Sequence, residues 1–307
     1  MPVGCNTVKK STSISESLKA KLGTKAQESG KKVVKVDIPF HKNRKGRPVR
    51  FVVVSDTHNG HHEAQMPEEG DVLLHCGDFT NKHDWKSEAY KTSLGNFNRW
   101  LGEQPYPIRI VIAGNHEVGF NKLSAEQIHK QYLSNATHYL QDSSCVVHGL
   151  RVHGSPWTRS RNMGFSASKE EITEKWKLIH RDTDLLMTHL PPYLLHDLAW
   201  VGNTGEKEAC SQCGIKHPTY RHWGERSLRK EVESRLSRVR VHCYGHVHDA
   251  PGSTQLGKVT FINASFDLKQ KVYTFEMNAG KEEEGEDKEK KKKKEKKKGN
   301  KKKEDTH

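Results

Sequence analysis

The stretch "VRVHCYGHVHDAPG", residues 239–252, joins a short apolar run to two histidines, His246 and His248, and then to a Pro-Gly turn. Residues two apart in an extended chain point to the same face. We therefore expect His246 and His248 to leave the end of a buried strand on one side and to face a common partner. The other strands of the fold decide what that partner is.

Four further apolar runs end in the same manner, each in residues that can bind a metal ion. Short, continuously apolar and mostly β-branched runs are typical of strands covered on both faces. The pattern predicts a core of buried strands whose polar residues gather at the strand ends. The four runs are "VRFVVVSDTH" at 49–58, "DVLLHCGDFT" at 71–80, "IRIVIAGNHE" at 108–117 and "DLLMTHLPP" at 184–192.

The segments between the runs have the apolar spacing of helices. Strands that alternate with helices predict an α/β layered domain. Antiparallel pairing is also indicated, because residues 145–157 have the form of a hairpin and residues 258–266 and 271–277 look like another strand pair. "VVKVDIPF" at 33–40 is a candidate edge strand, so we expect mixed sheets. The predicted helices cover residues 87–103, 124–133, 168–179 and 224–236.

The metal-binding candidates follow the apolar runs, where ligands collect beyond the carboxyl ends of strands. Carboxylates, imidazoles and an amide oxygen, without a thiolate, suit Mn, Fe, Zn or Mg ions. Seven donors are too many for one four-coordinate ion, but they suffice for two ions that share a carboxylate. Two such ions can clamp the attacking and leaving oxygens of a phosphoryl displacement. The candidates are Asp56, His58, Asp78, Asn115, His189, His246 and His248.

Five motifs, "SDTH", "GDFT", "GNHE", "MTH" and "GHVH", occur in this order and resemble those of the calcineurin-like metallophosphoesterases. The resemblance runs from about residue 50 to 266. Between the motifs, "VHGSPWTRSRNMGF" and "FINAS" are similar to the subgroup of metallophosphoesterase-domain-containing proteins of the fetal-brain type. The resemblance implies an α/β four-layer sandwich, in which two mixed β-sheets are flanked by helices.

The resemblance also implies a role for each residue that matches a motif. His116 would be catalytic, stabilising developing charge or protonating the leaving oxygen. Substrate contacts would come from Asn115 and His116, and Arg159 is a further candidate. The seven ligands would divide between two ions: Asp56, His58 and His248 on one, Asn115, His189 and His246 on the other, and Asp78 bridging both.

The implied activity is that of a dinuclear metal-dependent phosphodiesterase, which hydrolyses cyclic nucleotides or related phosphodiesters by attack of metal-bound hydroxide. Manganese is the metal expected in vitro. Three positions depart from the phosphoprotein phosphatases of the family. Asn81, followed by Lys82, and Ala113 stand where those enzymes carry Asp, Arg and a phosphate-gripping Arg. The departures argue against a phosphoprotein phosphatase, and the resemblance to the fetal-brain-type subgroup implies a small-molecule phosphodiester or nucleotide as substrate.

Other polar residues leave alternatives open. Glu117 is either an orienting partner of a ligand or an ordinary salt-bridge partner. Trp157, Arg159 and Arg161 are either substrate contacts or residues of a surface loop. Three histidines beside apolar runs are interpreted as hydrogen-bonded core residues: His75, His153 and His242.

A last set, Cys210, Cys213, His217 and His222, approximates the spacing C-x₂-C-x₃-H-x₄-H. A structural zinc site needs four such donors in tetrahedral reach. The gap between Cys213 and His217 is far shorter than in finger-type sites. The favoured interpretation is therefore a polar loop with incidental thiols.

Composition divides the chain into three parts: a basic, partly disordered segment 1–46, a metallophosphoesterase domain 47–280 with an insertion loop at 201–224, and a disordered tail 281–307. The tail holds thirteen lysines and nine acidic residues and no apolar side chain, so it cannot bury enough surface to fold. Its lysine runs could contact a polyanion or an acidic lipid surface, or serve as a nuclear address.

The same composition sets the alternative function and the location. The formal net charge of +14 leaves open a nucleotide- or nucleic-acid-binding protein with little turnover. No apolar run approaches the roughly 18 residues that a membrane span needs, and the N-terminus lacks the apolar core of a secretion signal. We therefore expect a cytoplasmic protein with reduced cysteines, with the nucleus as the alternative location.

Overall fold

The computed structural model describes residues 32–38, 48–81, 84–205 and 207–278. Most of the predicted N-terminal segment 1–46 and the whole predicted tail 281–307 lie outside the described residues. In the part of the chain that is described, no helix combines the length and the apolar character that crossing a membrane requires.

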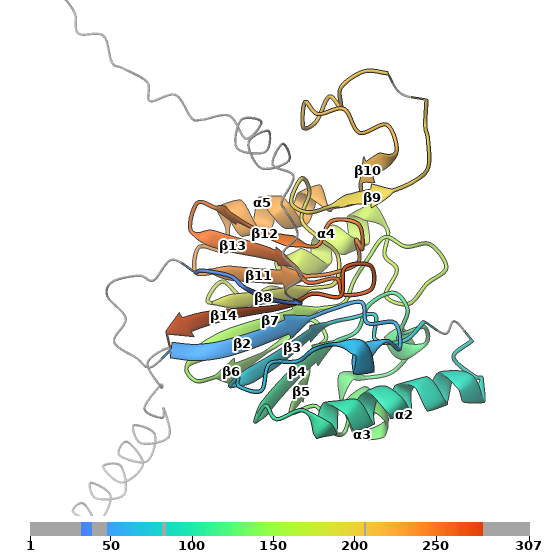
Figure 1. Ribbon diagram of the computed structural model, residues 1–307, viewed down its shortest axis with the longest axis vertical. Coiled ribbons are helices and arrows are strands. Elements are labelled where there is room, and N and C mark those ends of the chain that lie inside the picture. The colour runs from blue at the N-terminus through green and yellow to red at the C-terminus, as the bar shows by residue number, and fades with distance from the viewer. Residues whose placement is uncertain (1–31, 39–47, 82–83, 206, 279–307) are drawn as a thin grey trace, which may run out of the picture.

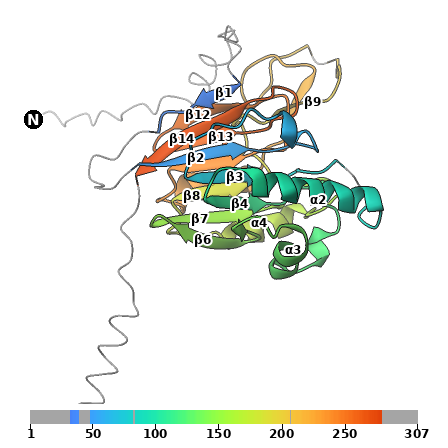
Figure 2. The same cartoon turned by 60° about the horizontal axis from the view of Figure 1, so that its bottom comes forward.

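Two six-stranded sheets form the centre of the molecule (Figure 1, Figure 2). The first has the order β1 (Val33–Lys35), β14 (Val272–Asn278), β2 (Pro48–Val54), β3 (Val72–Cys76), β4 (Ile108–Ile112) and β5 (His138–Tyr139). The second has the order β12 (Gly252–Leu256), β13 (Val259–Asn263), β11 (Val241–Tyr244), β8 (Leu185–Thr188), β7 (Leu150–Ser155) and β6 (Ser143–Val147).

Both sheets are mixed, as predicted. Strands β2 to β5 run parallel to one another, and β14 pairs antiparallel to β2. In the second sheet β7, β8, β11 and β13 are parallel, while the hairpin β6–β7 and the pair β12–β13 are antiparallel. The parallel runs bring the carboxyl ends of strands from both sheets to one edge of the molecule.

One predicted pairing is wrong. The segments 258–266 and 271–277 do form strands, β13 and β14, but each belongs to a different sheet. β13 pairs with β11 and β12, whereas β14 crosses to the first sheet and lies between β1 and β2. Strand propensity is local, but the partner of a strand is chosen by tertiary packing, which a short connection does not reveal.

Helices cover the outer faces of the two sheets, which gives the four predicted layers (Figure 1). Leu94, Phe97 and Leu101 of one helix pack with strand residues of the first sheet, and Trp176 and Val232 of two others pack on the second sheet. The helices are α2 (Glu88–Glu103), α3 (Ala125–Tyr132), α4 (Lys169–Lys177) and α5 (Arg226–Ser234), with 3₁₀ turns η1 (His61–Glu63) and η2 (Phe120–Lys122).

Three of these helices begin where the sequence places a serine. Ser87, Ser124 and Ser168 are N-caps whose hydroxyls accept a hydrogen bond from the first turn of α2, α3 and α4. The side chains of Gln127 and Glu171 accept a hydrogen bond from the backbone N–H of Ser124 and Ser168, which completes two capping boxes. Each such cap stabilises a helix by about 1 kcal/mol.

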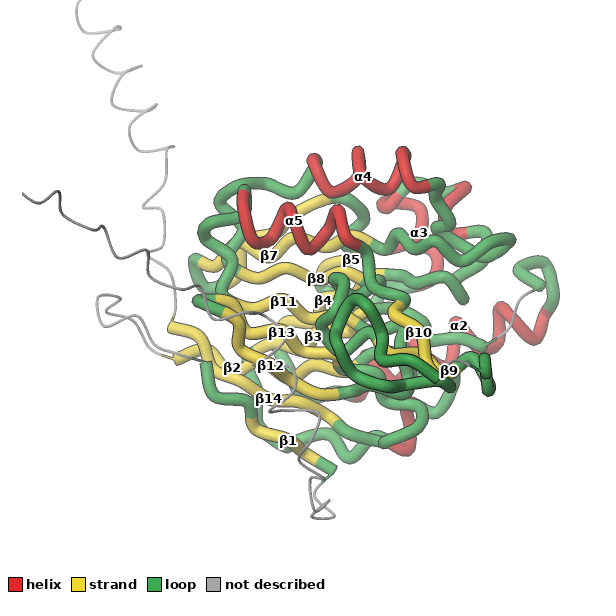
Figure 3. Tube along the Cα trace, turned by 90° about the horizontal axis from the view of Figure 1, so that it is seen from above, coloured by secondary structure: helices red, strands yellow, loops and turns green. Residues whose placement is uncertain are grey.

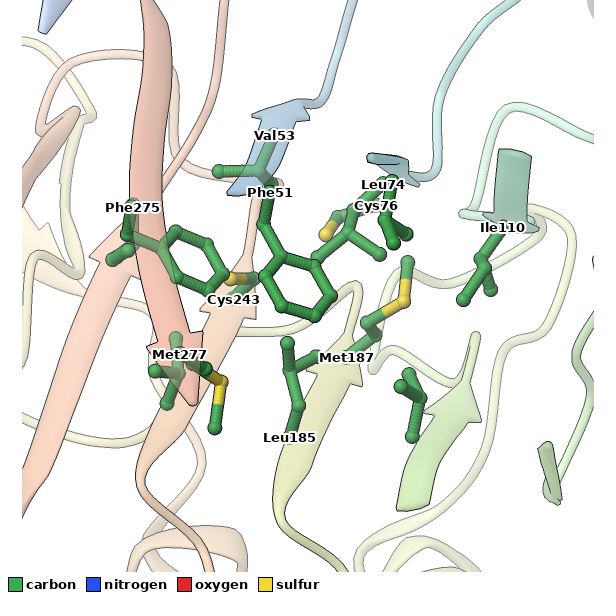
Figure 4. Close-up of a cluster of buried hydrophobic side chains, with 14 of the residues drawn as sticks. Phe51, Val53, Leu74, Cys76, Ile110, Leu185, Met187, Cys243, Phe275 and Met277 are labelled. Carbon is green, nitrogen blue, oxygen red and sulfur yellow. The ribbon is translucent and has the colours of Figure 1, made fainter. Parts of the chain in front are cut away.

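The core between the sheets is apolar and fully buried (Figure 4). Phe51 of β2 stacks on Phe275 of β14 with ring centroids 5.0 Å apart. Leu185, Met187 and Cys243 face them from the second sheet. This packing fixes one sheet on the other, so the loops at their common edge are held by a rigid base.

A two-stranded ribbon, β9 (Leu198–Trp200) and β10 (Tyr220–His222), projects beside that edge (Figure 3). The ribbon pairs antiparallel, and the predicted insertion 201–224 comprises its connecting loop and β10 itself. It belongs to neither large sheet.

Candidate metal centre

The predicted ligands lie in turns at the carboxyl ends of five strands, β2, β3, β4, β8 and β11. Three of the turns use left-handed backbone, with φ of 54° at Asp56, 54° at Asp78 and 69° at His246. Non-glycine residues adopt this conformation at a cost, and such residues cluster at functional sites. The turns, not the strands, aim the side chains.

The prediction that His246 and His248 share one face of an extended strand is therefore wrong. β11 ends at Tyr244, so the two histidines do not alternate on an extended strand. The left-handed residue His246 reverses the chain, and its N–H donates to both oxygens of Asp56 at 2.9 Å. The two rings enter two different groups of ligand atoms.

The first group consists of Asp56, His58 and His248, whose ligand atoms lie within 4.8 Å of one another. His248 Nε2 is 3.2 Å from Asp56 Oδ1 and 3.2 Å from His58 Nε2. Ser265 Oγ donates to Asp56 Oδ2 at 3.0 Å, which orients the carboxylate. Ser265 belongs to the "FINAS" segment but was not among the predicted site residues.

The second group consists of Asp78, His189 and His246. His189 Nε2 lies 3.1 Å from Asp78 Oδ2 and 3.2 Å from Asn115 Oδ1. Asp78 also lies 3.9 Å from His58 Nε2, so it stands between the two groups. The structure thus brings all seven predicted ligands to one place, with Asp78 in the shared position.

Outer polar contacts turn one nitrogen of three of the four imidazoles toward the groups. His189 Nδ1 bonds the carbonyl of Cys76 at 2.8 Å, and His58 Nδ1 bonds the carbonyl of Thr80 at 3.1 Å. His248 Nδ1 lies 3.3 Å from Asp267 Oδ2. Histidines that bind metals hold their second nitrogen in this way, which leaves Nε2 as the ligand atom.

The charges of the site suit cations. Burial opposes ionisation of Asp56 and Asp78, but neighbouring histidines, His248 for Asp56 and His189 for Asp78, hold the pKa of both carboxyls well below its usual range. Burial likewise disfavours charged imidazoles, yet the two aspartates raise the pKa of His189 and of His248 to about 9. Two buried carboxylates thus draw protons onto their neighbours, and divalent cations would replace those protons.

Glu117 holds the turns that carry the ligands. Its buried carboxylate accepts the N–H groups of Asp78, Phe79, Thr80 and Gly114 at 2.7–3.1 Å. Burial and the charge of Asp78 raise the pKa of Glu117 to about 8, while the N–H donors oppose the rise. Of the two interpretations of Glu117, the contacts support the orienting one.

Two glycines in the motifs allow the close approach of the carboxylates. A Cβ on Gly114 would lie 2.3 Å from Asp78 Oδ1, and a Cβ on Gly245 would lie 2.0 Å from Asp56 Oδ2. Any side chain at either position would displace a ligand. The pairs Gly-Asn and Gly-His in the sequence are therefore packing requirements of the site.

A pocket of about 430 Å³ opens over the two groups. Two of its walls are Trp200 and Trp223, which are 62% and 47% exposed and were not among the predicted site residues. They stand at the two ends of the insertion 201–224, and two tryptophans flanking a polar insertion are the signal that could have found them. The lining comprises Asp78, Asn115, His116, Ser160, Met163, Ala199, Trp200, Trp223, His246, Val247, His248, Asp249 and Leu268.

The other candidates lie apart from this pocket. Arg159 lines a neighbouring cavity, where its guanidinium is 3.8 Å from Glu225, and its contact with substrate stays a prediction. Trp157 Nε1 donates to Asp142 at 2.7 Å, and its ring packs against Phe165. The ring is therefore engaged in the fold.

The three histidines interpreted as core residues are buried, and each bonds a hydroxyl. His75 contacts Thr57 at 3.1 Å, His153 contacts Ser144 at 2.9 Å, and His242 contacts Thr188 at 2.8 Å. Burial lowers the pKa of His75 and of His242 to about 3. They are neutral parts of the core.

Comparison with known proteins confirms the resemblance stated from the motifs. A sequence model described as "Calcineurin-like phosphoesterase" matches residues 49–250. A UPF0046 protein of Caenorhabditis elegans is 38% identical over 251 residues, which cover 76% of this chain and 79% of that protein. Metallophosphoesterase domain-containing protein 1 of Homo sapiens is 36% identical over 239 residues, which cover 70% of this chain and 65% of the human protein.

A solved structure aligns with a TM-score of 0.50 and 15% sequence identity, over 71% of this chain and 90% of its own. At that identity the likeness concerns the fold alone.

Proposed function

The chain belongs to the calcineurin-like phosphoesterase family, and on that premise we propose that it is a dinuclear metal-dependent phosphodiesterase. Its substrates are cyclic nucleotides or related small phosphodiesters. One observation carries the proposal: two buried carboxylates and four imidazoles converge on two adjoining groups, which a third group of His58, Asp78 and His116 connects. Donors of this kind fit Mn, Fe, Zn or Mg.

In this proposal Asp78 belongs to both ions, and the remaining ligands divide between them. The ions, when bound, would activate water and neutralise charge on the phosphoryl group. The chain contributes a fixed geometry, because Glu117 and Ser265 hold the aspartates before any ion binds. Asp56, His58 and His248 would hold one ion, and Asn115, His189 and His246 would hold the other.

His116 is the proposed proton donor to the leaving oxygen. The backbone N–H of His116 donates to Asp78 Oδ1 at 2.8 Å, which fixes the residue relative to the proposed bridging carboxylate. Its ring lies edge-on to His58, with centroids 4.5 Å apart, and lines the pocket. A general acid in such a position contributes about 10²–10⁴-fold to the rate.

The walls of the pocket support a small substrate that carries a ring. Trp200 and Trp223 offer exposed aromatic faces beside the phosphoryl site, and a base or aryl group stacks on such faces. Ala113 is fully buried, so no guanidinium enters from that position to grip a phosphomonoester dianion. A volume of about 430 Å³ lies within the usual range of small-ligand sites.

The proposal is tested with the full chain, Mn²⁺ and a substrate panel. Bis(p-nitrophenyl) phosphate, p-nitrophenyl phosphate and cyclic mononucleotides report diester and monoester hydrolysis. We expect kcat/KM for the diester to exceed that for the monoester by at least about tenfold, and we expect chelator to abolish both. Preference for the monoester would refute the diesterase assignment, and activity unaffected by chelator would refute the metal dependence.

The lysine-rich tail supports a second candidate, a polyanion-binding protein with little turnover. It holds thirteen lysines between residues 281 and 307. Deleting that segment would abolish function in this second case and leave kcat intact in the first. Measuring kcat and nucleic-acid binding on the same deletion variant separates the two.

A further inference from the structure

The loop between β9 and β10, together with the end of β10, carries a second group of metal-binding side chains, none of which lines the pocket over the phosphoryl site. Cys210, Cys213, His217 and His222 place one ligand atom each within 4.8 Å of the others. Cys213 Sγ lies 3.3 Å from His217 Nε2. Tetrahedral zinc, with bonds of about 2.0–2.3 Å, separates its ligand atoms by roughly 3.3–3.8 Å. The spacing in the loop is close to that of a coordination shell.

Both histidines of the loop are held by their outer nitrogen. His222 Nδ1 bonds Asp197 Oδ1 at 2.8 Å, and His217 Nδ1 bonds the carbonyl of Tyr220 at 3.1 Å. A carbonyl or carboxylate partner accepts, so Nδ1 carries the proton and Nε2 keeps a lone pair. Both Nε2 atoms therefore face the two sulfurs as ligand atoms, in the arrangement typical of metal-bound histidine.

His222 is incomplete without a further partner. Its side chain is 8% exposed, and its Nε2 has no hydrogen-bond partner in the part of the chain that the structure describes. Buried polar atoms are normally satisfied. An ion among the four ligand atoms would satisfy this one.

The turn that carries the cysteines suits thiolate ligands. Gly214 N donates to the carbonyl of Cys210 at 2.8 Å, and Gly214 adopts a left-handed φ of 72° that favours glycine. Gln212 N lies 3.5 Å from Cys210 Sγ and donates to it. The two cysteines are free thiols, so no disulfide competes for the sulfurs.

The geometry also explains why the spacing looked unfavourable. Finger-type sites separate their cysteines from their histidines by a long segment that contains a helix. Here the ribbon brings the donors together instead, because the pairing of β10 with β9 returns His222 to the cysteines. The four side chains thus lie together, which favours a metal site over the interpretation of the thiols as incidental.

We propose that Cys210, Cys213, His217 and His222 bind one structural Zn²⁺. Two thiolates and two imidazoles balance the charge of the ion and leave no open position, which is the composition of a closed structural site. Sulfur ligands also separate this site chemically from the phosphoryl centre, whose predicted ligands are oxygen and nitrogen atoms. The proposal does not depend on the activity of the phosphoryl centre.

The ion would fix a wall of the substrate pocket. Asp197, which holds His222, also accepts the N–H groups of Leu194 and Gly224 at 2.9 and 3.2 Å. Trp200 N donates to Asp249 Oδ2 at 2.9 Å, beside the ligand His248. The zinc loop thus connects through the ribbon to both tryptophans of the pocket.

The test measures metal in the full chain, with Zn²⁺ and Co²⁺ as probes. Asp78→Asn removes the ligand proposed to be shared by both phosphoryl-site ions, and after loading and desalting the zinc that Cys213→Ser removes from this variant reports the loop. We expect about one zinc per Asp78→Asn chain, and we expect near-zero zinc when Cys213→Ser is added. The matched control adds Cys145→Ser, a half-buried cysteine of β6, and should retain the zinc.

Cobalt distinguishes the ligands by spectroscopy. The Co²⁺ form of Asp78→Asn should show thiolate-to-cobalt charge-transfer bands, and Cys213→Ser should remove them. A second variant, His217→Cys, keeps four donors and should strengthen the bands by about half because it adds a third thiolate. Absence of stoichiometric zinc in Asp78→Asn, or zinc and bands unchanged by Cys213→Ser, would overturn the site. The His217→Cys result decides the matter if Cys213→Ser fails to fold.

Discussion

The molecule carries two ligand groups of opposite construction, one at the edge of the sheets and one in the loop between β9 and β10. The sheet-edge group draws its ligands from five strands, between Asp56 and His248, and sits on a buried apolar core. The loop group draws its ligands from Cys210 to His222. Among the described residues from Val201 to Trp223, only Cys213 is buried.

The difference predicts what each part of the molecule would lose without metal. The sheet edge is assembled by packing between two sheets, so its ligands stand in place before an ion binds. The loop has almost no apolar core to offset the entropy of ordering its residues. We therefore expect loss of metal to abolish chemistry at the sheet edge and to abolish order in the loop.

The largest expected effect is that of Asp78→Asn. The amide cannot supply the charge that two cations share, so kcat/KM should fall by about 10³-fold or more. The fold should persist, with a Tm within about 4 °C of the parent. Activity assays and thermal unfolding measure the two quantities.

The control for this substitution is Asp182→Asn, whose side chain is 57% exposed and distant from the ligand set. It should leave both quantities unchanged. Full activity and metal content in Asp78→Asn would disprove the dinuclear assignment. Unfolding of that variant would contradict the view that packing alone assembles the sheet edge.

The next effect is expected from Glu117→Gln. Each Glu117 oxygen accepts two N–H groups, so the amide nitrogen of glutamine would face two donors in either orientation. The turns that carry Asp78 and Asn115 should shift, and affinity for the catalytic metals should fall about 10–100-fold. Titration of activity with Mn²⁺ measures this loss.

Glu103→Gln, on the exposed end of α2, is the matched control. An unchanged Mn²⁺ dependence in Glu117→Gln would mean that the ligand turns hold their shape without it.

The sequence was sufficient to predict most of the sheet edge. Apolar runs that end in Asp56, Asp78, Asn115, His189 and His246 predicted strands, layers and a common edge, because strand direction fixes where such residues emerge. The alternation argument for His246 and His248 failed, because a left-handed residue begins directly after β11. Backbone turns of that kind follow from tertiary contacts, here the bonds to Asp56.

The sequence was less informative about which segments lie side by side. β13 and β14 are close in sequence but lie in different sheets, because tertiary packing selects the partner of each strand. The short gap between Cys213 and His217 argues against zinc from the sequence alone. The sequence does not reveal the β9–β10 pairing that brings His222 back to the cysteines. Trp200 and Trp223 could not be predicted as pocket walls, because the sequence does not show which exposed aromatic residues border a pocket.

A smaller effect is expected when the loop loses its metal, provided that the proposed function holds. Cys213→Ser should loosen the wall formed by Trp200 and Trp223, raising KM for an aryl phosphodiester by about 3–10-fold with little change in kcat. Limited proteolysis should then cut faster between β9 and β10. Cys145→Ser should change neither measurement. Unaltered KM together with unaltered proteolysis would mean that the ribbon is ordered without the ion.

The smallest effect concerns a buried histidine that belongs to neither group. His242 Nε2 bonds Thr188, and its Nδ1, like Nε2 of His222, has no hydrogen-bond partner among the described residues. A vacant nitrogen alone is therefore no evidence of metal. What separates the two is that His222 has three further donors within 4.8 Å.

His242 should act instead as an acid-sensitive element of the core. Burial lowers its pKa to about 3, whereas an unfolded histidine titrates near pH 6.5. The unfolded state therefore binds a proton first, so stability falls as pH decreases from about 6.5 toward 3. Between pH 7 and 5 this one group accounts for a loss of about 2 kcal/mol.

His242→Gln should remove that share of the acid loss, measured as the free energy of unfolding in denaturant at both pH values. His180→Gln, whose side chain is 56% exposed, is the control. An equal acid loss in His242→Gln and in the parent would show that His242 does not titrate as a buried neutral group. The contrast with the loop would then weaken, because an unpartnered nitrogen in the core would need an explanation of its own.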